Sequence, residues 1–221
     1  MTSGNSSFPR RLTKIDELTR PDHSFLAPED ECFYLGDYTA RKGFAHSATN
    51  NLIINLKKPM DRRGTAQWPY KARAIEQAAD ALKNALSGTP LQSITFVPIP
   101  PSKAKSDAAY DDRMLQVLNR LGQGLDVREM VNLPTSMAAA HDSSERPRPD
   151  ELAARYELVE SACSPEPTMI ILCDDVLTTG CHFRAMHRVL RARFPLVRIC
   201  GIFLARRVPQ PLEFEPVDLD S

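Results

Sequence analysis

The sequence predicts an α/β fold in which a doubly wound, mainly parallel sheet forms the core. Apolar runs such as TMIILC and VRICGIFLA show no alternation of polar and apolar residues, as expected for strands that are buried on both faces. Segments with apolar residues at helical spacing separate these runs, which is the order expected of a parallel sheet covered by helices. A chain of 221 residues is long enough for one such domain with a small addition.

In the N-terminal part, the sequence predicts a flexible arm followed by two short elements. Residues 1–28 are polar and contain three prolines, so we expect a flexible arm there. CFYLGDYTARKGF predicts a short strand followed by a turn, and SATNNLIINLKKP predicts a short helix that ends before Pro59. We assign residues 29–70 to a small N-terminal hood, in which 61–69 is a loop.

The core, assigned to residues 71–206, begins with the longest predicted helix. Apolar residues at helical spacing predict this helix over residues 71–87, and a glycine and a proline directly after it form the stop signal. SITFVPIP predicts a buried strand over residues 93–100, which ends at prolines that cannot continue a ladder. A second helix is predicted over residues 110–122, and REMVNLP is predicted to form a short strand.

The second half of the core holds the two most apolar runs. Residues 134–149 form a polar connection rich in prolines, and connections of this length are usually functional or disordered. ELAARYELV adds a short ordered piece. TMIILC then predicts a buried strand, CHFRAMHRVLRARF an amphipathic helix and VRICGIFLA a second buried strand. Residues 207–221 form an acidic tail with three prolines.

The composition argues against several classes of protein. Lysine plus arginine equals aspartate plus glutamate at 28 each, so the net charge does not support a protein that binds nucleic acid chiefly through its phosphates. No apolar run is long enough for a membrane span, and the N-terminus lacks the apolar segment of a signal peptide. Five cysteines without CxxC spacing indicate neither a disulfide framework nor a zinc site, so we expect a cytoplasmic protein.

Two unusual loops follow predicted strands and are expected to meet at one site. PPSKAKSD follows the first buried strand, and DDVLTTGCH follows TMIILC. In an open parallel sheet, ligands bind outside the carboxyl ends of the strands. Thr178, Thr179 and Gly180 open a helix, where free N–H groups bind phosphate. Asp174 and Asp175 would accept hydrogen bonds from hydroxyl groups, so the loop predicts a cradle for a ribose 5-phosphate whose hydroxyls satisfy the two acids.

Three other interpretations compete with this cradle. The acidic pair can be a solvated strand end followed by a threonine N-cap, but that interpretation does not require Thr-Thr-Gly directly after the pair. A Walker loop needs a lysine after the glycine, and Cys181 stands there. A metal site made by acids alone explains Asp174 and Asp175 but not the threonines.

The stretch IILCDDVLTTGCH resembles the phosphoribosyl-pyrophosphate (PRPP) motif of type I phosphoribosyltransferases, with an apolar strand, two acids and Thr-Thr-Gly. More of the chain, over about residues 93–206, is similar to the ComF-like branch of that family. VPIPPSKAK, SSERPRPDELAARYEL and IFLARR carry this similarity, while YLGDYTARKGF and NLKKP carry a weaker one. The cysteine cluster of many ComF-type proteins is absent, and Cys181 and His182 replace the small or hydroxyl residues that usually follow Thr-Thr-Gly.

The resemblance implies a site built from both loops. The two acids would hold the ribose hydroxyls, the loop from Thr178 to His182 the 5′-phosphate, and the loop from Pro100 to Lys103 the pyrophosphate. Lys103 and Asp175 are the implied catalytic residues. Mg²⁺ is the implied cofactor, which Asp174 and Asp175 would contact indirectly, through the ligand or water. The implied substrate-binding residues are Asp174, Asp175, Val176, Leu177, Thr178, Thr179, Gly180, Cys181 and His182 of one loop, and Pro100, Pro101, Ser102, Lys103 and Lys105 of the other.

The resemblance also implies a reaction, in which a nitrogenous acceptor displaces pyrophosphate at C1′ of PRPP. A small nucleobase-like molecule is the default acceptor. Two alternatives stay open: a non-catalytic regulator that senses PRPP or a nucleotide, and a component of a DNA-uptake or anti-phage defence system. The net charge of zero gives no support to a nucleic-acid partner. We expect no membrane partner, and the sequence leaves open whether the chain acts alone or as a homodimer.

Two further groups of residues are candidates for contacts to the substrate. Arginines in or beside the long connection could close over it, and aromatic residues of the hood could stack on a base. Solvent exposure and core packing are the competing explanations. These candidates are Arg146, Arg148 and Arg155, and Tyr34, Tyr38 and Phe44.

Overall fold

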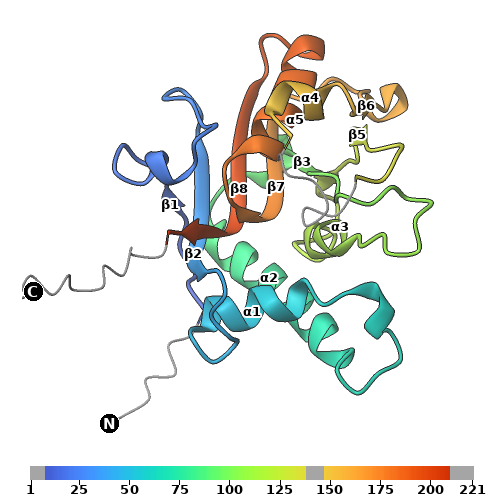
Figure 1. The fold of residues 1–221 in the computed structure, drawn as a ribbon. Helices are drawn as coiled ribbons and strands as arrows, with labels where there is room; N and C mark the ends of the chain where they lie inside the picture. The colour runs from blue at the N-terminus through green and yellow to red at the C-terminus, as the bar shows by residue number, and fades with distance from the viewer. Residues whose placement is uncertain (1–7, 138–146, 210–221) are drawn as a thin grey trace, which may run out of the picture.

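Residues 8–137 and 147–209 are described by the computed structural model, and a six-stranded sheet lies at their centre (Figure 1). The first strand pairs antiparallel with its neighbour, and the other pairs in this sheet are parallel. The prediction of an α/β fold with a mainly parallel sheet is confirmed, and the arrangement is compatible with double winding. In spatial order the strands are β1 (Thr13–Lys14), β2 (Cys32–Thr39), β8 (Arg198–Val208), β7 (Met169–Leu177), β3 (Thr95–Pro98) and β4 (Asp126–Val127).

β7 and β8 lie at the centre of the sheet because their side chains are apolar on both faces. Most of their residues are buried, and the two strands pair from Met169↔Arg198 to Leu177↔Arg206. The apolar run alone predicted a strand of six residues. β7 is longer because its backbone still pairs with β8 beyond that run, so Asp174 and Asp175 lie inside the strand rather than after it.

Helices cover both faces of the sheet and enclose two apolar clusters. One cluster packs α1 (Ala48–Leu56), α2 (Pro69–Ala85) and α3 (Arg113–Leu118) onto one face. The other cluster packs α4 (Pro149–Ala153) and α5 (Cys181–Arg193) onto the opposite face. Figure 1 shows α1 with α2 and α4 with α5 as two separate pairs. The predicted helices are present, although α3 is shorter than the predicted range of 110–122.

A small second sheet pairs β5 (Val131–Asn132) with β6 (Glu157–Leu158). REMVNLP therefore contains a strand as predicted, but that strand lies outside the main sheet. The neighbour of β3 at the sheet edge is β4 instead, through the pairs Thr95↔Asp126 and Phe96↔Val127. Short 3₁₀ helices lie at Arg20–Asp22, Met60–Arg62, Leu91–Ser93 and Glu160–Ala162.

The N-terminal segment differs most from the prediction of a flexible arm over residues 1–28. Residues 1–7 lie outside the described part, but β1 pairs with β2, and the side chains of Ile15, His23 and Leu26 are buried. A polar, proline-containing composition suggested that this segment could not pack. A few well-placed side chains suffice, because the edge of the sheet and the start of α5 offer them an apolar surface.

The predicted N-terminal hood is not a separate unit. β2 lies inside the main sheet and pairs with β8 along most of its length, and α1 packs against α2. The predicted tail also begins inside β8, and residues 210–221 lie outside the described part. None of the described helices has the length and apolar character needed to cross a membrane.

The order of the strands reverses between β3 and β7. From β3 the chain runs through α3 to β4 on one side, and from β7 it runs through α5 to β8 on the other. The helices α3 and α5 lie on opposite faces, so the loops after β3 and β7 diverge. Open α/β sheets bind ligands at such a point. Both loops singled out from the sequence follow these two strands.

Candidate ligand site at the carboxyl edge of the sheet

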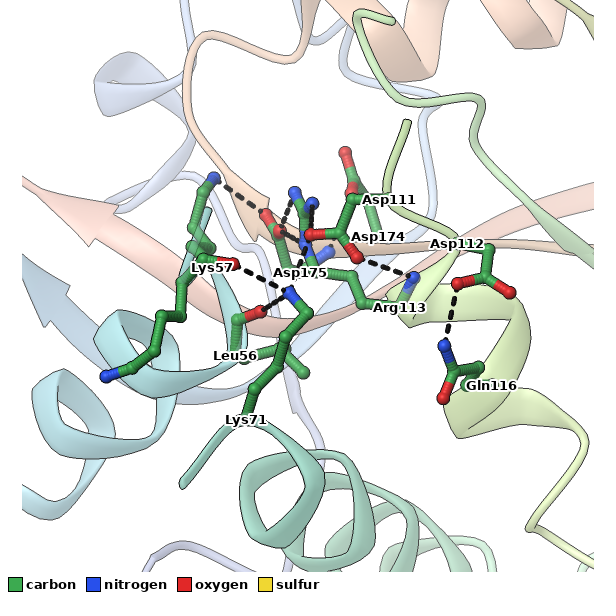
Figure 2. Close-up of polar contacts among 10 residues, drawn as sticks. Leu56, Lys57, Lys71, Asp111, Asp112, Arg113, Gln116, Asp174 and Asp175 are labelled. Carbon is green, nitrogen blue, oxygen red and sulfur yellow. Dashed lines mark hydrogen bonds and ion pairs between the residues drawn. The ribbon is translucent and has the colours of Figure 1, made fainter. Parts of the chain in front are cut away.

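Asp175 lies in a buried network of charges (Figure 2). Its side chain is 3% exposed; Oδ1 accepts a hydrogen bond from Lys57 Nζ at 3.1 Å and Oδ2 accepts one from Arg113 Nε at 2.7 Å. Burial alone would raise the pKa of Asp175, but the charges of Arg113 and Lys57 outweigh burial and lower it far below its ordinary value. Cations of the protein thus already neutralise the carboxylate that we expected a ligand's hydroxyls to satisfy.

Lys71 and Asp111 extend this network between α1, α2 and α3. Lys71 is 2% exposed, and its Nζ donates hydrogen bonds to Leu56 O at 2.6 Å and to Asp111 Oδ2 at 2.7 Å. Asp111 Oδ2 also accepts a hydrogen bond from Arg113 NH1 at 2.9 Å. Burial lowers the pKa of Lys71, and its hydrogen bond to Asp111 opposes that effect. Arg113 therefore joins the two acids, because it binds Asp111 and Asp175 at once.

Asp174 differs from Asp175 in both surroundings and charge. Its Oδ1 accepts a hydrogen bond from the backbone N–H of Asp175 at 2.7 Å, and its side chain lines a cleft. Burial, followed by the negative charge of Asp175, raises the pKa of Asp174 to about 7. One acid of the pair is therefore fully ionised at neutral pH while the other is partly protonated, which relieves the repulsion between neighbouring carboxylates.

The cleft lies between the carboxyl ends of β3 and β7 and encloses about 40 Å³. Asp174 lines it together with four of the predicted pyrophosphate-loop residues, whereas Ser102 does not. This volume holds a few water molecules, so a larger ligand would extend through the mouth of the cleft. Further lining residues include Tyr110, Asp112, Arg113, Glu129 and Asn132, and the four predicted ones are Pro100, Pro101, Lys103 and Lys105.

Two lysines of the loop after β3 are paired with acids at the rim of the cleft. Lys103 Nζ lies 3.9 Å from Asp107 Oδ2, and Lys105 Nζ lies 2.8 Å from Glu129 Oε2. The side chains of the two lysines are 35% and 55% exposed, and ion pairs with this exposure contribute little. An anionic ligand can therefore compete for both ammonium groups. Ser136 holds the loop in place, because its Oγ accepts a hydrogen bond from Ala104 N at 3.0 Å.

The turn between β7 and α5 presents N–H groups at the start of a helix. Gly180 has a φ of +83° directly before α5, a conformation that glycine adopts without strain. Within residues 8–137 and 147–209, no acceptor contacts the N–H groups of Thr178, Thr179 and Gly180. Free N–H groups at a helix N-terminus bind anions. The turn is therefore suited to a phosphate.

The other residues of the predicted phosphate loop are occupied within the protein. The side chains of Val176 and Leu177 belong to the two apolar clusters. Cys181 Sγ donates to Pro147 O at 3.1 Å, and burial raises the pKa of this thiol to about 11, so it is no nucleophile. His182 Nδ1 lies 3.1 Å from Tyr156 Oη, and burial lowers the pKa of the ring. His182 is therefore neutral at pH 7 and does not add a positive charge for the phosphate.

The predicted aromatic residues do not form one surface over the cleft. Tyr34 is 8% exposed, with the Arg206 guanidinium 5.2 Å from its ring centre, and Tyr38 packs against the apolar cluster of α1 and α2. Phe44 is exposed and lines a different groove, near the start of α1. Of the predicted arginines, Arg146 lies outside the described residues, and Arg148 and Arg155 are exposed.

A scan against known protein-family models finds no match, and a search of curated proteins finds none either. The resemblance to ComF-like phosphoribosyltransferases therefore stays a prediction based on the motifs. The site rests on its own geometry: an acidic strand end, a cleft with two lysines, and a turn with free N–H groups, all at the carboxyl edge of the sheet.

Sequence reasoning missed the cations that neutralise Asp175. Lys57 stands 118 residues before Asp175 and Arg113 stands 62 residues before it, so no local pattern links them to the acid. A weak signal existed in NLKKP and YDDR, where charged residues stand directly at the end or start of an apolar helix. Such charges are usually solvated, and only the packing of α1 and α3 against the sheet reveals their partner.

The cleft fits Mg²⁺ only as an indirectly held ion. The described residues contain no cluster of three acids, histidines or cysteines that could hold a metal. Asp112 and Asp174 nevertheless line the same cleft, and oxygen ligands suit an ion that keeps several of its waters. An ion in the cleft would take its remaining ligands from the substrate and from water.

Proposed function

We propose that this chain has a type I phosphoribosyltransferase-like fold, binds PRPP with Mg²⁺ between the ends of β3 and β7, and transfers the phosphoribosyl group to a nitrogenous acceptor. One observation carries the proposal. At the point where the strand order reverses, a turn with free N–H groups follows β7, the strand that holds the two acids, and a cleft lined by two lysines lies beside this turn. A ligand with a phosphate, vicinal hydroxyls and a second anionic group matches this set of groups.

Each part of the site has a role in this proposal. The N–H groups of Thr179 and Gly180 bind the 5′-phosphate. Asp174 accepts a ribose hydroxyl, because it lines the cleft and its second carboxylate oxygen has no partner among the described residues. Lys103 and Lys105 give up their exposed ion pairs with acidic side chains of the protein and bind the pyrophosphate instead. Asp175 contributes by orienting Arg113, which also lines the cleft.

The proposed reaction forms one bond and breaks one. A nitrogen lone pair of the acceptor attacks C1′, the bond between C1′ and the pyrophosphate oxygen breaks, and its electron pair leaves with the pyrophosphate. Bound Mg²⁺ would supply charge neutralisation on the pyrophosphate oxygens. The protein's own part is positioning, together with stabilisation of the developing negative charge by Lys103 and Arg113.

A non-catalytic PRPP sensor is the second candidate, and the state of Asp175 favours it. Both oxygens of this carboxylate are taken by Lys57 and Arg113, which removes one of the two acids from direct contact with ribose. A sensor needs only the phosphate turn, Asp174 and the cleft lysines. It would bind PRPP but release no pyrophosphate with any acceptor.

Thermal unfolding with and without PRPP and Mg²⁺ tests the binding that both candidates share. A ligand at a hundredfold its dissociation constant stabilises a protein by about 2.7 kcal/mol, which for a chain of this size raises the melting temperature by roughly 5–10 °C. No shift at millimolar PRPP with Mg²⁺ would overturn the proposed site. Pyrophosphate release, measured across a panel of bases, nucleosides and RNA, then separates the enzyme from the sensor.

A further inference from the structure

Residues 20–30, called the N-terminal strap below, lie against the turn between β7 and α5. His23 Nδ1 hydrogen-bonds to the backbone oxygen of Thr178, and the N–H of Phe25 donates to the backbone oxygen of Thr179 at 2.9 Å. Leu26 packs against Gly180 so closely that a Cβ on that glycine would lie 2.8 Å from Leu26 Cδ2. Every residue of the turn is thus contacted by a segment that precedes it by about 150 residues.

The strap is itself fixed at both ends. Asp22 Oδ2 accepts a hydrogen bond from Arg206 NH1 of β8 at 2.9 Å. Asp30 Oδ1 accepts one from Arg184 NH1 in the first turn of α5 at 2.7 Å, and its Oδ2 accepts one from Ala27 N at 2.7 Å. These bonds tie the strap to the strand and the helix on either side of the turn. The strap therefore has a fixed position, from which it can hold the turn in place.

The bonds to the strap determine where the N–H groups of the turn point. In a trans peptide, the C=O and N–H bonds point in opposite directions, and within the described residues the only cis peptide precedes Pro165. The oxygen of Thr178 points at His23, so the N–H of Thr179 points away from the strap. The oxygen of Thr179 points at Phe25, so the N–H of Gly180 does the same. Two neighbouring N–H groups that point the same way form an anion-binding concavity.

His23 is suited to this task because it is completely buried. A backbone oxygen can only accept, so the proton of the neutral ring must be on Nδ1. Burial lowers the pKa of His23, which favours this neutral form. Its Nε2 has no hydrogen-bond partner among the described residues. An imidazole with a bare buried nitrogen costs stability, so a purely structural position would be better filled by an apolar side chain.

We infer that the N-terminal strap is part of the phosphate-binding site and that His23 is its positioning residue, which holds the Thr178–Gly180 turn with its N–H groups aimed at the phosphate of a phosphate monoester. His23 does not touch the ligand. It acts through the carbonyl of Thr178. The inference rests on the proposed function, because it assumes that the turn binds the 5′-phosphate of the substrate.

Binding of two part-ligands to three variants tests the inference. Ribose 5-phosphate is the probe for the turn, and pyrophosphate with Mg²⁺ is the probe for the loop after β3; both are measured by calorimetry. His23→Leu removes the donor and puts an apolar side chain of similar size in its place. His23→Asn restores a donor, because the amide nitrogen of asparagine takes nearly the place of Nδ1. His46→Leu is the control, since His46 is exposed and lines another groove.

His23→Leu is expected to weaken ribose 5-phosphate binding about tenfold, the effect of roughly one misdirected hydrogen bond to a charged group. Pyrophosphate binding should stay within about twofold of the parent, and His23→Asn should recover most of the lost affinity. His46→Leu should change neither. Unchanged ribose 5-phosphate binding in His23→Leu, or equal losses for both probes, would overturn the role of the strap.

The two levels of the inference can fail separately. If the parent protein does not bind ribose 5-phosphate, the proposed function and the role of the strap both fail. If the parent binds it and His23→Leu binds it equally well, only the role of the strap fails. Should His23→Leu not fold, the amide resonances of the parent decide. Ribose 5-phosphate should then shift the amide signals of Thr179 and Gly180 more than those elsewhere in α5, and the absence of that pattern would refute the inference.

Discussion

Replacing Asp175 by asparagine tests the buried charge network directly. The substitution keeps the shape of the side chain, but the NH₂ group of the new amide cannot accept a hydrogen bond from a cation. Removing one partner of a buried ion pair costs about 3–5 kcal/mol. The cost here lies at the lower end, because Arg113 keeps its bond to Asp111 at 2.9 Å, and Lys57 is 46% exposed and contributes at most about 1 kcal/mol.

We therefore expect Asp175→Asn to lower the free energy of unfolding by about 3 kcal/mol, or the melting temperature by roughly 6–12 °C. Urea unfolding of the ligand-free protein near neutral pH measures this. The matched control is Asp174→Asn, whose oxygen can still accept the N–H of residue 175 and which removes a charge beside Asp175. Near neutral pH its stability should be equal to or above that of the parent, because the amide removes the buried charge beside Asp175.

A larger loss in Asp174→Asn than in Asp175→Asn would refute this reasoning, because the network would then not depend on Asp175. Repulsion between neighbouring carboxylates alone would favour a neutral amide at either position, with little loss of stability. The structure reverses that expectation for Asp175 only, since its oxygens hold Lys57 and Arg113.

Three further predictions concern the cleft. Lys103→Ala should lower the rate of pyrophosphate release by a larger factor than it weakens ribose 5-phosphate binding, because Lys103 would act on the leaving group. Single-turnover kinetics measure the rate and calorimetry measures the binding, and equal effects on both would contradict this role. Asp174→Asn should weaken PRPP binding by about 1.5–3 kcal/mol, as for a hydrogen bond to a charged group, and tighter binding by calorimetry would count against contact with ribose. Because the pKa of Asp174 is raised to about 7, the folded protein keeps a proton that the unfolded chain loses above about pH 4; this acid therefore makes stability fall as the pH rises from about 4 to 7. In Asp174→Asn, the free energy of unfolding, measured with urea at about pH 5 and pH 7, should therefore differ less between the two pH values than in the parent. An unchanged difference would exclude this effect of Asp174.

The sequence predicts those parts of the fold that follow from local patterns. Uniformly apolar runs identified β7 and β8, and helical spacing identified α2 and α5, because each pattern is contained in one element. The flexible arm and the hood were predicted from polarity and prolines. Neither property reveals that Leu26 fits against Gly180 or that β2 pairs with β8, because both contacts join distant parts of the chain.

The candidate site was predictable to a similar degree. Thr179 and Gly180 stand where the turn was expected, and Lys103 and Asp174 lie at one cleft, since carboxyl ends of neighbouring parallel strands share an edge. The state of charge was not predictable. It depends on which cations fold back onto Asp175, and those come from the ends of two helices on one face of the sheet.

The position of β2 has a consequence for how the protein is made. β2 is the first long strand to leave the ribosome, yet its parallel partner β8 follows every other described strand. Until β8 is synthesised, β2 has only the two-residue β1 beside it, and its other edge stays unpaired. Pairing between distant segments is slow, and uncovered strand edges promote aggregation. Cells that synthesise this protein would therefore need to protect its N-terminal third for most of translation, and a chain cut before β8 would become a substrate for chaperones and proteases.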